Sequence, residues 1–347
     1  MERYSTIPIK PYFCSVQSPS ALDSSTTTPP DTIHVVIPLF NDWEALNLLL
    51  ERIRVVVEPS VLSRLSFLVV DDCSAQDYQT LPTGVGQSLS ILRLYRNVGH
   101  QKAIALGLAY LADQPTLCST IVMDSDGEDQ PEDIPKLVWA SVEKPGHVVF
   151  AQRTKRRERL LFRVFYFLYK SVFRLLTGKA ITFGNFSLVP PNLLRKLAHV
   201  SEIWNNYPGG VIRSRLPYTA IPLERGVRLA GESKMNFVSL ILHGLSTVSV
   251  LMDTTAVRIA LFCVMAALAS VVGIGIVVVL RFFTDFGPKP GVPSWGSYLV
   301  IWFLVVIMQA FLISLLLVFI VLTYRTQPQF IPATQYQSFV ERREVIY

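Results

Sequence analysis

Acidic side chains crowd into one short segment of this chain, 120–132, which reads T-I-V-M-D-S-D-G-E-D-Q-P-E. A run with β-branched residues leads directly into Asp124, Asp126, Glu128 and Asp129. Side chains two positions apart on an extended chain project to the same side, so the first three carboxylates can converge just past a buried strand. They would repel one another unless a cation lay between them. One or two carboxylates together with substrate phosphates are the usual ligands of Mg²⁺ or Mn²⁺.

The same segment allows a plainer interpretation, in which the acids form a solvated turn before a helix. Pro131, Glu132 and Asp133 suit the first turn of such a helix, because proline fits the first helical position and acids favour the positive end of the helix dipole. On this segment alone, the metal–diphosphate site and the solvated turn are equally good hypotheses. The choice between them depends on what the rest of the chain brings to the same place.

Three further motifs follow runs that are predicted to be strands. Residues 36–42 read V-I-P-L-F-N-D, residues 67–77 read F-L-V-V-D-D-C-S-A-Q-D, and residues 96–103 read R-N-V-G-H-Q-K-A. The carboxyl ends of parallel strands meet at one edge of an α/β sheet, and ligands bind at that edge. Together with the acidic segment, four such motifs in series favour one shared crevice over four unrelated turns.

The elements that must position these motifs alternate between short β-rich runs and amphipathic stretches. Strands are predicted at 33–39, 67–70, 89–95, 121–124 and 148–151, and helices at 43–57, 102–112 and 132–143. This alternation is typical of an α/β fold with a doubly wound, mostly parallel sheet. No internal repeat is evident.

The composition is too apolar for an ordinary soluble protein. Of the 347 residues, 50% are hydrophobic and only 17% are charged, and the mean hydropathy is +0.38. The excess is concentrated in 259–280 and 291–324, which contain no charged residue. About 20 apolar residues let a helix cross the hydrocarbon core of a bilayer. Two transmembrane helices are therefore predicted within 258–322, and a buried helical hairpin is the alternative.

The distribution of charge orients these helices. Lysine and arginine are denser before the first helix than in the linker between the two, and they continue after the second. The positive-inside rule therefore places both termini and the large N-terminal region in the cytoplasm, at the inner (cytoplasmic) membrane. The net charge of +6 favours anionic lipid and phosphate as partners over nucleic acid. The four cysteines have no metal-binding spacing and are assigned no chemistry.

The remaining segments are expected to surround these two parts. Residues 1–31 are rich in Ser, Thr and Pro and are predicted to form a disordered tail. Residues 156–176 are basic and aromatic, which is typical of an amphipathic helix at a membrane surface; a helix packed on the sheet is the alternative. Residues 235–257 are expected to form a juxtamembrane helix along the interface, and residues 323–347 a cytoplasmic tail.

Taken as a set, the motifs V-I-P-L-F-N-D, V-D-D-C-S, N-V-G-H-Q-K-A and M-D-S-D resemble those of the family 2 glycosyltransferases, which have the A-type, nucleotide-diphosphosugar-binding fold. The two apolar C-terminal segments and R-L-A-G-E-S-K at 228–234 narrow this resemblance. They are similar to the polyprenyl-phosphate glycosyltransferases, the group that includes dolichol-phosphate mannose synthase and the bacterial undecaprenyl-phosphate glucosyltransferases. The resemblance covers roughly 32–322 and implies a cytoplasmic glycosyltransferase domain at 32–234.

The resemblance also implies roles for individual residues. The residues expected to bind the donor nucleotide are Pro38, Asp71, Asp72, Asn97, Gly99 and Asp124, and those expected to bind the metal, Mg²⁺ or Mn²⁺, are Asp124, Asp126 and Glu128. The acceptor phosphate is expected to contact Arg153, Arg163, Arg228, Ser233 and Lys234. The residues expected to act in catalysis are Asp126, Arg153, Arg228 and Lys234. Glu128 stands where relatives often have a glutamine, and Asp129 is expected only as helix-start charge. Turn capping is the alternative for Asp72 and Asn97, and an ordinary surface salt bridge for Arg153 and Arg228.

The chain departs from the family pattern in the segment 182–188, T-F-G-N-F-S-L. Many relatives have an aspartate at the position of Asn185 and an arginine at that of Ser187. That aspartate would matter for a sugar hydroxyl acceptor, which must lose a proton. A lipid monophosphate is largely a dianion at neutral pH, because its second pKa is about 6, so it needs no base.

The function implied is inverting transfer of a hexose from a nucleotide-diphosphosugar, with UDP-glucose as the expected donor, to undecaprenyl phosphate at the cytoplasmic membrane face. The alternatives are the same reaction with mannose, N-acetylglucosamine or aminoarabinose, or a non-catalytic membrane scaffold that retains the fold. A processive polysaccharide synthase would need more membrane helices and a Q-x-x-R-W motif, which this chain lacks. Relatives form homo-oligomers, so the resemblance implies self-association as well.

Overall fold

The computed structural model describes residues 32–78, 80–153, 171, 174–178, 183–231, 245–246, 248–283 and 295–347. Within these residues one sheet of eight strands forms, in the order β7-β5-β6-β4-β1-β2-β3-β8. Its strands are β1 (Ile33–Leu39), β2 (Leu65–Asp71), β3 (Ser88–Leu94), β4 (Ser119–Val122), β5 (Val148–Arg153), β6 (Phe183–Val189), β7 (Tyr218–Leu223) and β8 (Val340–Val345).

The sheet is mostly parallel. β1 pairs in parallel with β2 and β4, β2 with β3, and β5 with β7, whereas β6 is antiparallel to both β4 and β5 and β8 is antiparallel to β3. All strands except β6 and β8 therefore run in the same direction, and their carboxyl ends share one edge. The predicted α/β architecture with a mostly parallel sheet is confirmed. The five strands predicted from the sequence correspond to β1–β5, while β6, β7 and β8 were not predicted.

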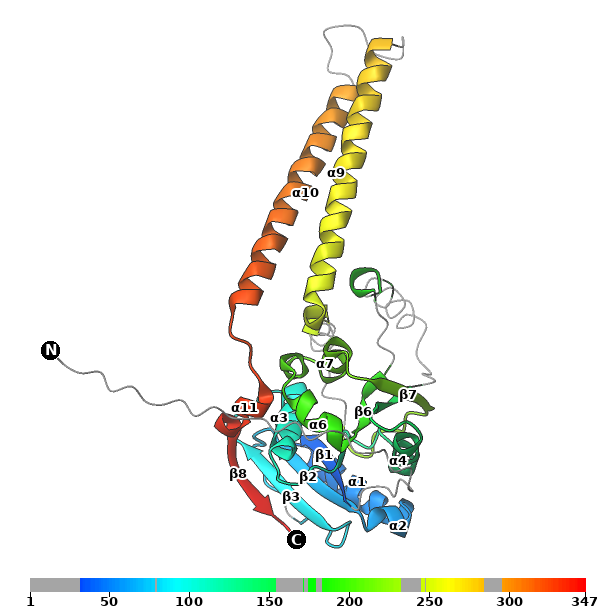
Figure 1. Cartoon of the computed structure of the whole chain (residues 1–347), viewed down its shortest axis with the longest axis vertical. Helices are drawn as coiled ribbons and strands as arrows, with labels where there is room; N and C mark the ends of the chain where they lie inside the picture. The colour runs from blue at the N-terminus through cyan, green and yellow to red at the C-terminus, as the bar shows by residue number, and fades with distance from the viewer. Residues whose placement is uncertain are drawn as a thin grey trace, which may run out of the picture.

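Helices cover both faces of the sheet (Figure 1). They are α1 (Trp43–Val56), α2 (Pro59–Leu62), α3 (His100–Ala112), the 3₁₀ turn η1 (Pro131–Asp133), α4 (Ile134–Glu143), α6 (Pro191–Ala198), η2 (Ser201–Trp204) and α7 (Tyr207–Ser214). The predicted helix at 132–143 is thus divided between η1 and α4. The other two predicted helices correspond to α1 and α3, and α3 begins two residues earlier than predicted.

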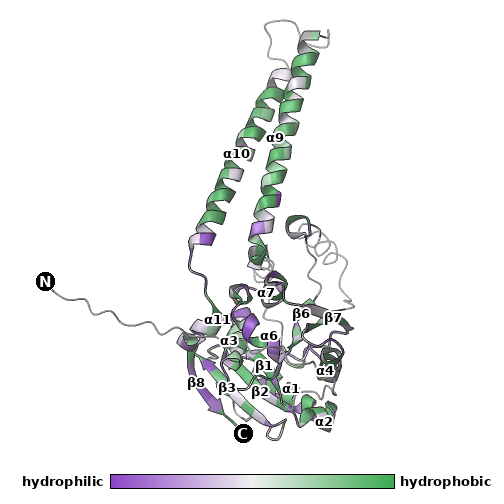
Figure 2. Ribbon diagram, viewed as in Figure 1, coloured by the Kyte–Doolittle hydropathy of each residue, from purple (hydrophilic) through white to green (hydrophobic). Residues whose placement is uncertain are grey.

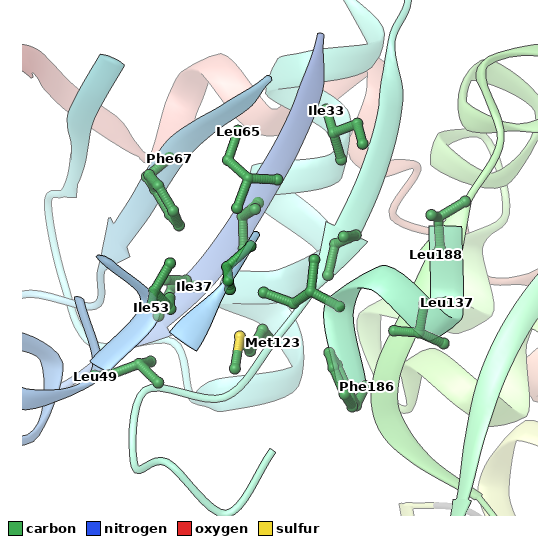
Figure 3. Packing of buried hydrophobic residues seen from close by; sticks show 14 of the residues in the cluster. Ile33, Ile37, Leu49, Ile53, Leu65, Phe67, Met123, Leu137, Phe186 and Leu188 are labelled. Atoms are coloured by element: carbon green, nitrogen blue, oxygen red, sulfur yellow. The ribbon is translucent and has the colours of Figure 1, made fainter. Parts of the chain in front are cut away.

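Two apolar clusters, one on each face, hold these layers together. On one face, Leu49 and Ile53 of α1 lie near Ile37 of β1, and Leu137 of α4 lies beside Leu188 and Phe186 of β6, as Figure 3 shows. On the other face, α3, α6 and α7 pack over the alternate residues of the same strands. Every residue of β2 is buried, which is expected for a strand covered on both sides by helices. The central strands are therefore firmly placed, and the loops at their carboxyl ends start from fixed points.

Two long helices, α9 (Met252–Phe283) and α10 (Trp295–Thr326), extend together away from the sheet (Figure 1). Their spans Met252–Leu280 and Gly296–Thr326 have mean hydropathies of 2.8 and 3.0, and 11% and 6% of their most apolar windows are buried. A helix of this length reaches about 40 Å, more than the ~30 Å hydrocarbon core. Both helices are long and apolar enough to cross a membrane, and the colouring of Figure 2 shows that most of their residues are hydrophobic.

The chain beyond α10 returns to the sheet. The short elements α11 (Pro332–Gln335) and η3 (Tyr336–Phe339) lead into β8, which pairs with β3. The expectation of a simple tail at 323–347 is therefore corrected, because these residues complete one edge of the sheet. The predicted tail at 1–31 and most of the predicted helix at 156–176 lie outside the described residues, as do 235–244 and 247 of the predicted juxtamembrane segment; the last residues of that segment, from Met252, belong to α9.

Candidate functional site

The acidic loop 124–129 leaves the carboxyl end of β4 and is closed by its own carboxylates. The Asp124 backbone N–H donates to Asp129 Oδ2 at 3.0 Å, and the Glu128 N–H donates to Asp126 Oδ1 at 3.0 Å. Asp129 is only 4% exposed. It therefore does more than add charge to a helix start, which was the expectation: it fixes the backbone of Asp124. Gly127 has φ +80°, a conformation that favours glycine, and it allows the tight turn between the acids.

A second segment, 224–229, packs directly against this loop after β7. The Leu229 N–H donates to the Asp126 carbonyl at 2.9 Å, and the Gly226 N–H donates to the Glu128 carbonyl at 2.8 Å. A Cβ on Gly127 would lie 2.4 Å from Leu229 Cγ, so the two segments are in close contact. These backbone hydrogen bonds set the position of the arginines on the second segment relative to the acids.

Two arginines of this segment neutralise the loop. Arg228 Nη1 lies 3.2 Å from Asp126 Oδ2, and its other terminal nitrogen pairs with Asp42 after β1. Arg225 pairs with Glu128. Arg228 therefore makes a salt bridge, as its alternative interpretation held, but its partner is a candidate metal ligand at the site. Arg225 was not singled out from the sequence, although its spacing of three from Arg228 in R-G-V-R was a usable signal.

The acids nevertheless remain mutually repulsive. Burial raises the pKa of Asp126, and the nearby charges of Asp124 and Asp42 add to this, while Arg228 and Arg225 oppose it. A carboxylate pair of this kind has hard oxygen donors and a local excess of negative charge, which suits a divalent cation. Among the residues that the structure describes, no three His, Cys, Asp or Glu side chains are grouped to hold a metal.

The donor set therefore fits a metal that is completed by substrate phosphates. Asp124 and Asp126 would be its protein ligands, because Mg²⁺ takes one or two carboxylates in such sites. Glu128, the third expected ligand, pairs with Arg225. Glu128 and Arg225 line a small cavity together with Gly184 and Phe186 of β6.

Asp124 also contacts the start of α3 and of β6. His100 Nε2 lies 3.1 Å from Asp124 Oδ1, and the Asn185 amide nitrogen lies 3.4 Å from the same oxygen. Burial lowers the pKa of His100, but the facing charge of Asp124, followed by Asp126 and Asp129, outweighs this and raises the pKa overall. His100 was not identified from the sequence as a site residue; its place as the first residue of a helix that follows a strand-end motif was the available signal.

The two family-atypical positions are satisfied within the protein. Asn185 Oδ1 accepts a hydrogen bond from Gln101 Nε2 at 3.0 Å, and Gln101 Oε1 accepts one from the Tyr207 backbone N–H at 2.7 Å. The Ser187 hydroxyl lies 2.7 Å from the buried Tyr207 hydroxyl. Burial accordingly raises the pKa of Tyr207 far above its ordinary value, so its hydroxyl stays protonated. Asn185 is thus placed at the acidic loop, whereas Ser187 lies within the core.

At the ends of β2 and β3, the predicted nucleoside residues form a bonded turn. Asp72 accepts hydrogen bonds from the backbone N–H groups of Val98 and Gly99 at 2.7 and 2.8 Å, and the Asn97 side chain donates to the Asp72 carbonyl. Burial raises the pKa of Asp72, which these backbone donors partly offset. These contacts match the turn-capping alternative for Asp72 and Asn97. Pro38, in the neighbouring strand β1, is buried.

Asp71 is tied to a different partner. Its Oδ1 accepts the Ser74 backbone N–H at 3.0 Å, and its Oδ2 lies 3.3 Å from Arg93 Nη1. Asp71 is 1% exposed, so both of its oxygens are committed to holding the start of the loop after β2. It thus lies at the predicted edge of the sheet, beneath that loop.

The remaining candidates cannot all be placed. Arg153 ends β5, where it is paired with Leu223 at the end of β7, so its backbone reaches the same edge as the acidic loop. Its side chain lies outside the described part of the chain, as do Arg163, Ser233 and Lys234. The described site therefore brings together the acids of the 124–129 loop with Arg228, and the turn of Asp72 with Asn97 and Gly99.

Part of this chain is similar to proteins of a known family. Residues 34–198 match the profile of the family described as Glycosyl transferase family 2. An uncharacterized glycosyltransferase of Bacillus subtilis strain 168 is 26% identical over 286 residues, which cover 77% of this chain and 81% of the relative. The family match contains every described candidate residue except Arg228.

Two solved structures are also similar to this chain. Glucosyl-3-phosphoglycerate synthase from Mycobacterium tuberculosis, solved with Mn²⁺, UDP and glucosyl-3-phosphoglycerate, is 18% identical, with a TM-score of 0.45 and coverage of 65% of this chain and 80% of that one. A mannosyltransferase from Pyrobaculum calidifontis, in complex with GDP-Man and Mn²⁺, is 14% identical, with a TM-score of 0.39 and coverage of 83% and 88%.

Proposed function

We infer that this chain, whose residues 34–198 match the profile of glycosyl transferase family 2, transfers a hexose from a nucleotide-diphosphosugar to a polyprenyl phosphate. UDP-glucose is the expected donor and undecaprenyl phosphate the expected acceptor. The observation that carries this proposal is the contact between Asp126 and Arg228, because it joins an acid suited to a metal–diphosphate with a cation suited to an acceptor phosphate. The helices α9 and α10 support a lipid acceptor, since they are long and apolar enough to hold the domain at a bilayer.

On the donor side, the chain supplies binding and orientation. Asp124 and Asp126 would hold Mg²⁺ or Mn²⁺, which when bound neutralises the charge that develops on the leaving diphosphate. Asp129 accepts a hydrogen bond from the Asp124 backbone N–H, and this bond fixes the backbone from which the Asp124 carboxylate extends. The turn of Asp72, Asn97 and Gly99, with Pro38 and Asp71, forms the proposed nucleoside side of the crevice.

On the acceptor side, Arg228 is the described residue proposed to bind the lipid phosphate. A guanidinium presents several N–H donors in a planar fork that matches phosphate oxygens. Asp42 holds one terminal nitrogen of Arg228, which limits how far the fork can move. Arg153, Arg163, Ser233 and Lys234 are proposed to complete this phosphate site.

The reaction is then one displacement. A phosphate oxygen of the lipid attacks the anomeric carbon, the carbon–oxygen bond to the nucleotide diphosphate breaks, and its electron pair leaves with the diphosphate. The configuration at that carbon inverts. The acceptor is mostly dianionic at neutral pH, so no general base is required, and the neutral Asn185 beside Asp124 is compatible with this. Positioning and electrostatic stabilisation account for the catalysis.

The substrates can be identified directly. The full-length protein, purified in detergent, is incubated with undecaprenyl phosphate, Mn²⁺ and a panel of labelled UDP- and GDP-sugars. We expect a labelled lipid product with one donor, UDP-glucose first. A product with mannose, N-acetylglucosamine or aminoarabinose would keep the reaction class and change the sugar. Absence of any lipid product across the panel, from a folded protein, would contradict the proposed acceptor.

Removal of the central acid is the first mutational prediction. We expect Asp126→Asn to lower turnover by about 100-fold or more, because it removes one of only two proposed protein ligands of the metal. Glu143→Gln changes an exposed acid at the end of α4 and serves as the control with unchanged turnover. Steady-state transfer rates and a thermal melt of each variant give the comparison. Unchanged turnover in folded Asp126→Asn would contradict the metal role.

The competing function is a membrane scaffold that has kept the fold without activity. Isothermal titration with UDP and Mn²⁺ separates the two, since a retained scaffold has no need to bind nucleotide with metal. Self-association and a cytoplasmic site for the domain are further parts of the proposal. They are tested by light scattering of the detergent-solubilised protein and by protease protection in membrane vesicles.

A further inference from the structure

The last strand of the chain lies beside the proposed nucleoside side of the crevice. β8 follows the apolar helix α10 and pairs with β3 in antiparallel register, with Arg342 opposite Arg93 and Glu344 opposite Ile91. Beyond β8, the Ile346 N–H donates to the Leu89 carbonyl at 2.9 Å, and the Tyr347 hydroxyl donates to the Val85 carbonyl at 2.8 Å. The C-terminal residues are therefore anchored along the whole length of β3.

Glu344 on this strand holds an arginine at the carboxyl end of β3. Its Oε1 accepts a hydrogen bond from Arg93 Nε at 2.8 Å, and Arg93 is only 11% exposed. Ile91 lies opposite Glu344, and side chains two apart on a strand share a face. Arg93 and Glu344 therefore lie on the same side of the sheet. Glu344 on β8 thus orients the Arg93 guanidinium.

Arg93 in turn holds both ends of the segment 71–78, the first part of the connection between β2 and β3. Its Nη1 lies 3.3 Å from Asp71 Oδ2 at the start of this segment, and its Nη2 lies 2.6 Å from Asp77 Oδ1 near the end of the segment. The guanidinium also lies 6.0 Å from the ring centroid of Tyr78. One side chain therefore bridges the two ends of 71–78 and sets the shape of the segment between them.

We propose that Glu344 is a positioning residue for donor binding, acting through Arg93 on the loop 71–78 beside the nucleoside. This inference rests on the proposed function, since it assumes that a nucleotide binds at this edge of the sheet. It gives the C-terminal strand a role in the active site, although the strand follows both long apolar helices in the sequence. Glu344 would not touch the nucleotide. It holds Arg93, and Arg93 holds the segment 71–78.

The competing explanation is that Glu344 only stabilises the edge of the sheet. Edge strands are commonly protected by charged side chains, and β8 has several. The two explanations differ in what they predict for the donor. If Glu344 only stabilises the sheet, its substitution lowers the melting temperature and leaves the affinity of the folded protein for nucleotide unchanged. A positioning role changes nucleotide affinity in protein that is still folded.

The test uses the full-length protein in detergent and two matched substitutions on the same strand. Glu344→Gln keeps the size of the side chain and removes its charge. Glu341→Gln does the same at an exposed position that pairs with Arg342 and not with Arg93, so it is the control. The dissociation constant for UDP, and separately for GDP, is measured by titration with Mn²⁺ present, together with the melting temperature and the KM for donor and for undecaprenyl phosphate.

We expect Glu344→Gln to weaken binding of the preferred nucleotide by roughly tenfold and to raise the donor KM similarly, with the acceptor KM unchanged; outer partners of liganding groups typically have effects of this size. Arg93→Lys, which keeps the charge but loses the fork, should show the same split. If the wild type binds nucleotide and folded Glu344→Gln binds it equally well, the inference is wrong and the proposed function stands. If the wild type binds neither nucleotide, the proposed function fails and the inference fails with it.

Discussion

At the scale of single residues, each acid that could hold a metal already has a cationic or polar neighbour. Asp126 contacts Arg228, Glu128 contacts Arg225, and Asp124 lies beside His100. These cationic or polar side chains now neutralise the acids. A divalent cation that bound the acids would either displace these side chains or share the carboxylates with them. Arg228 in particular contacts Asp126 with one terminal nitrogen and Asp42 with the other.

The effect of Arg228 on metal binding gives a prediction that is separate from its effect on transfer. We expect Arg228→Gln to tighten Mn²⁺ binding in the absence of nucleotide by about fivefold, because a competing charge worth ~1 kcal/mol beside Asp126 is removed. Transfer to the lipid should fall by at least about tenfold, because a phosphate-binding group is lost. Titration of Mn²⁺ followed by the signal of the free ion measures the first effect, and product formation measures the second.

Arg54→Gln is the matched control for this substitution. Arg54 is an exposed arginine on α1 that pairs with Glu51, and its replacement should change neither quantity. Should Mn²⁺ binding weaken in Arg228→Gln in parallel with transfer, Arg228 would instead be a structural support of the acidic loop, and its role at the acceptor would need another residue.

The sequence indicated the acids of the proposed site and could not indicate their partners. Asp124 and Asp126 stand out because they follow a buried run with a spacing of two. Arg228 is 102 positions from Asp126, and the hydrogen bonds that bring it there come from the backbone of a segment with no regular pattern. Asp129 shows the same limit: its burial depends on how the loop closes.

At the scale of elements, two loops from different strands pack into one unit. The loop 124–129 and the segment 224–229 are joined by backbone hydrogen bonds, and Gly127 lies where they approach most closely. Asp126 is adjacent to this contact. The position of its carboxylate therefore depends on a glycine that both accepts a positive φ and leaves room for Leu229.

Gly127→Ala tests this packing. A Cβ there would lie 2.4 Å from Leu229 Cγ, and φ is +80°, so the variant carries both a steric clash and backbone strain of about 1–3 kcal/mol. We expect turnover to fall by about tenfold or more, because the loop must move to accommodate the methyl group. A lower melting temperature, by several degrees, should accompany it.

Gly84→Ala provides the matched control, because Gly84 has φ +75° and nothing within 4 Å of an added Cβ. It bears the same kind of backbone strain without the clash, so we expect a similar loss of stability with turnover unchanged. Equal turnover in the two variants would show that the contact between the loops does not position Asp126. Melting curves and transfer assays on both proteins supply the comparison.

Two of the three strands that the sequence failed to predict, β7 and β8, share a physical reason, which is that they form the two edges of the sheet. β1 and β2 are covered on both faces and read as continuous apolar runs, which are recognisable. β7 lies at one edge of the sheet, contains Pro222 and has a single buried residue. β8 reads V-E-R-R-E-V at the other edge and has no buried residue. Edge strands lack the burial pattern that makes a strand visible in a sequence, because their side chains face solvent.

At the scale of the whole molecule, both apolar helices are fastened to the same region of the domain. At the start of α9, Asp253 pairs with Arg213 of α7 at 2.5 Å. After α10, the rings of Phe330 and Phe339 pack on Trp204 of η2, with centroids 3.9 and 5.2 Å apart. The domain is therefore tied at two points close to where the helices begin and end. This arrangement would hold the acidic loop at a fixed height above a bilayer.

The domain is also built from two separate stretches of the sequence, one before α9 and one after α10. The helices α9 and α10 stand between β7 and β8, so any truncation that removes them from the C-terminal side removes a strand of the sheet as well. Ile346 and Tyr347 pack on the main apolar cluster, and β8 covers the edge of β3. A soluble version of the domain must therefore keep the residues that follow α10.

Two shortened chains test this. One ends at residue 251; in the other, residues 252–326 are replaced by a flexible Gly/Ser linker, so that 327–347 remain. Both lose the helices and the pair between Asp253 and Arg213 equally, so they differ only in the C-terminal segment. Loss of the packed side chains of 327–347, Tyr336 and Tyr347 among them, and of the edge pairing is expected to cost a few kcal/mol or more, and ~1 kcal/mol shifts the melting temperature of a domain this size by about 2–4 °C.

We therefore expect the chain ending at 251 to melt about 10 °C lower than the linked chain, and to aggregate through the exposed edge of β3. The linked chain should remain monodisperse and bind UDP with Mn²⁺. Tyr347→Ala in the linked chain should melt between the two, since it removes one core contact and the hydrogen bonds to Val85 while leaving β8 in place. Equal melting temperatures for the two shortened chains would mean that β8 is not part of the folding unit, and would also remove the structural basis for coupling Glu344 to the donor.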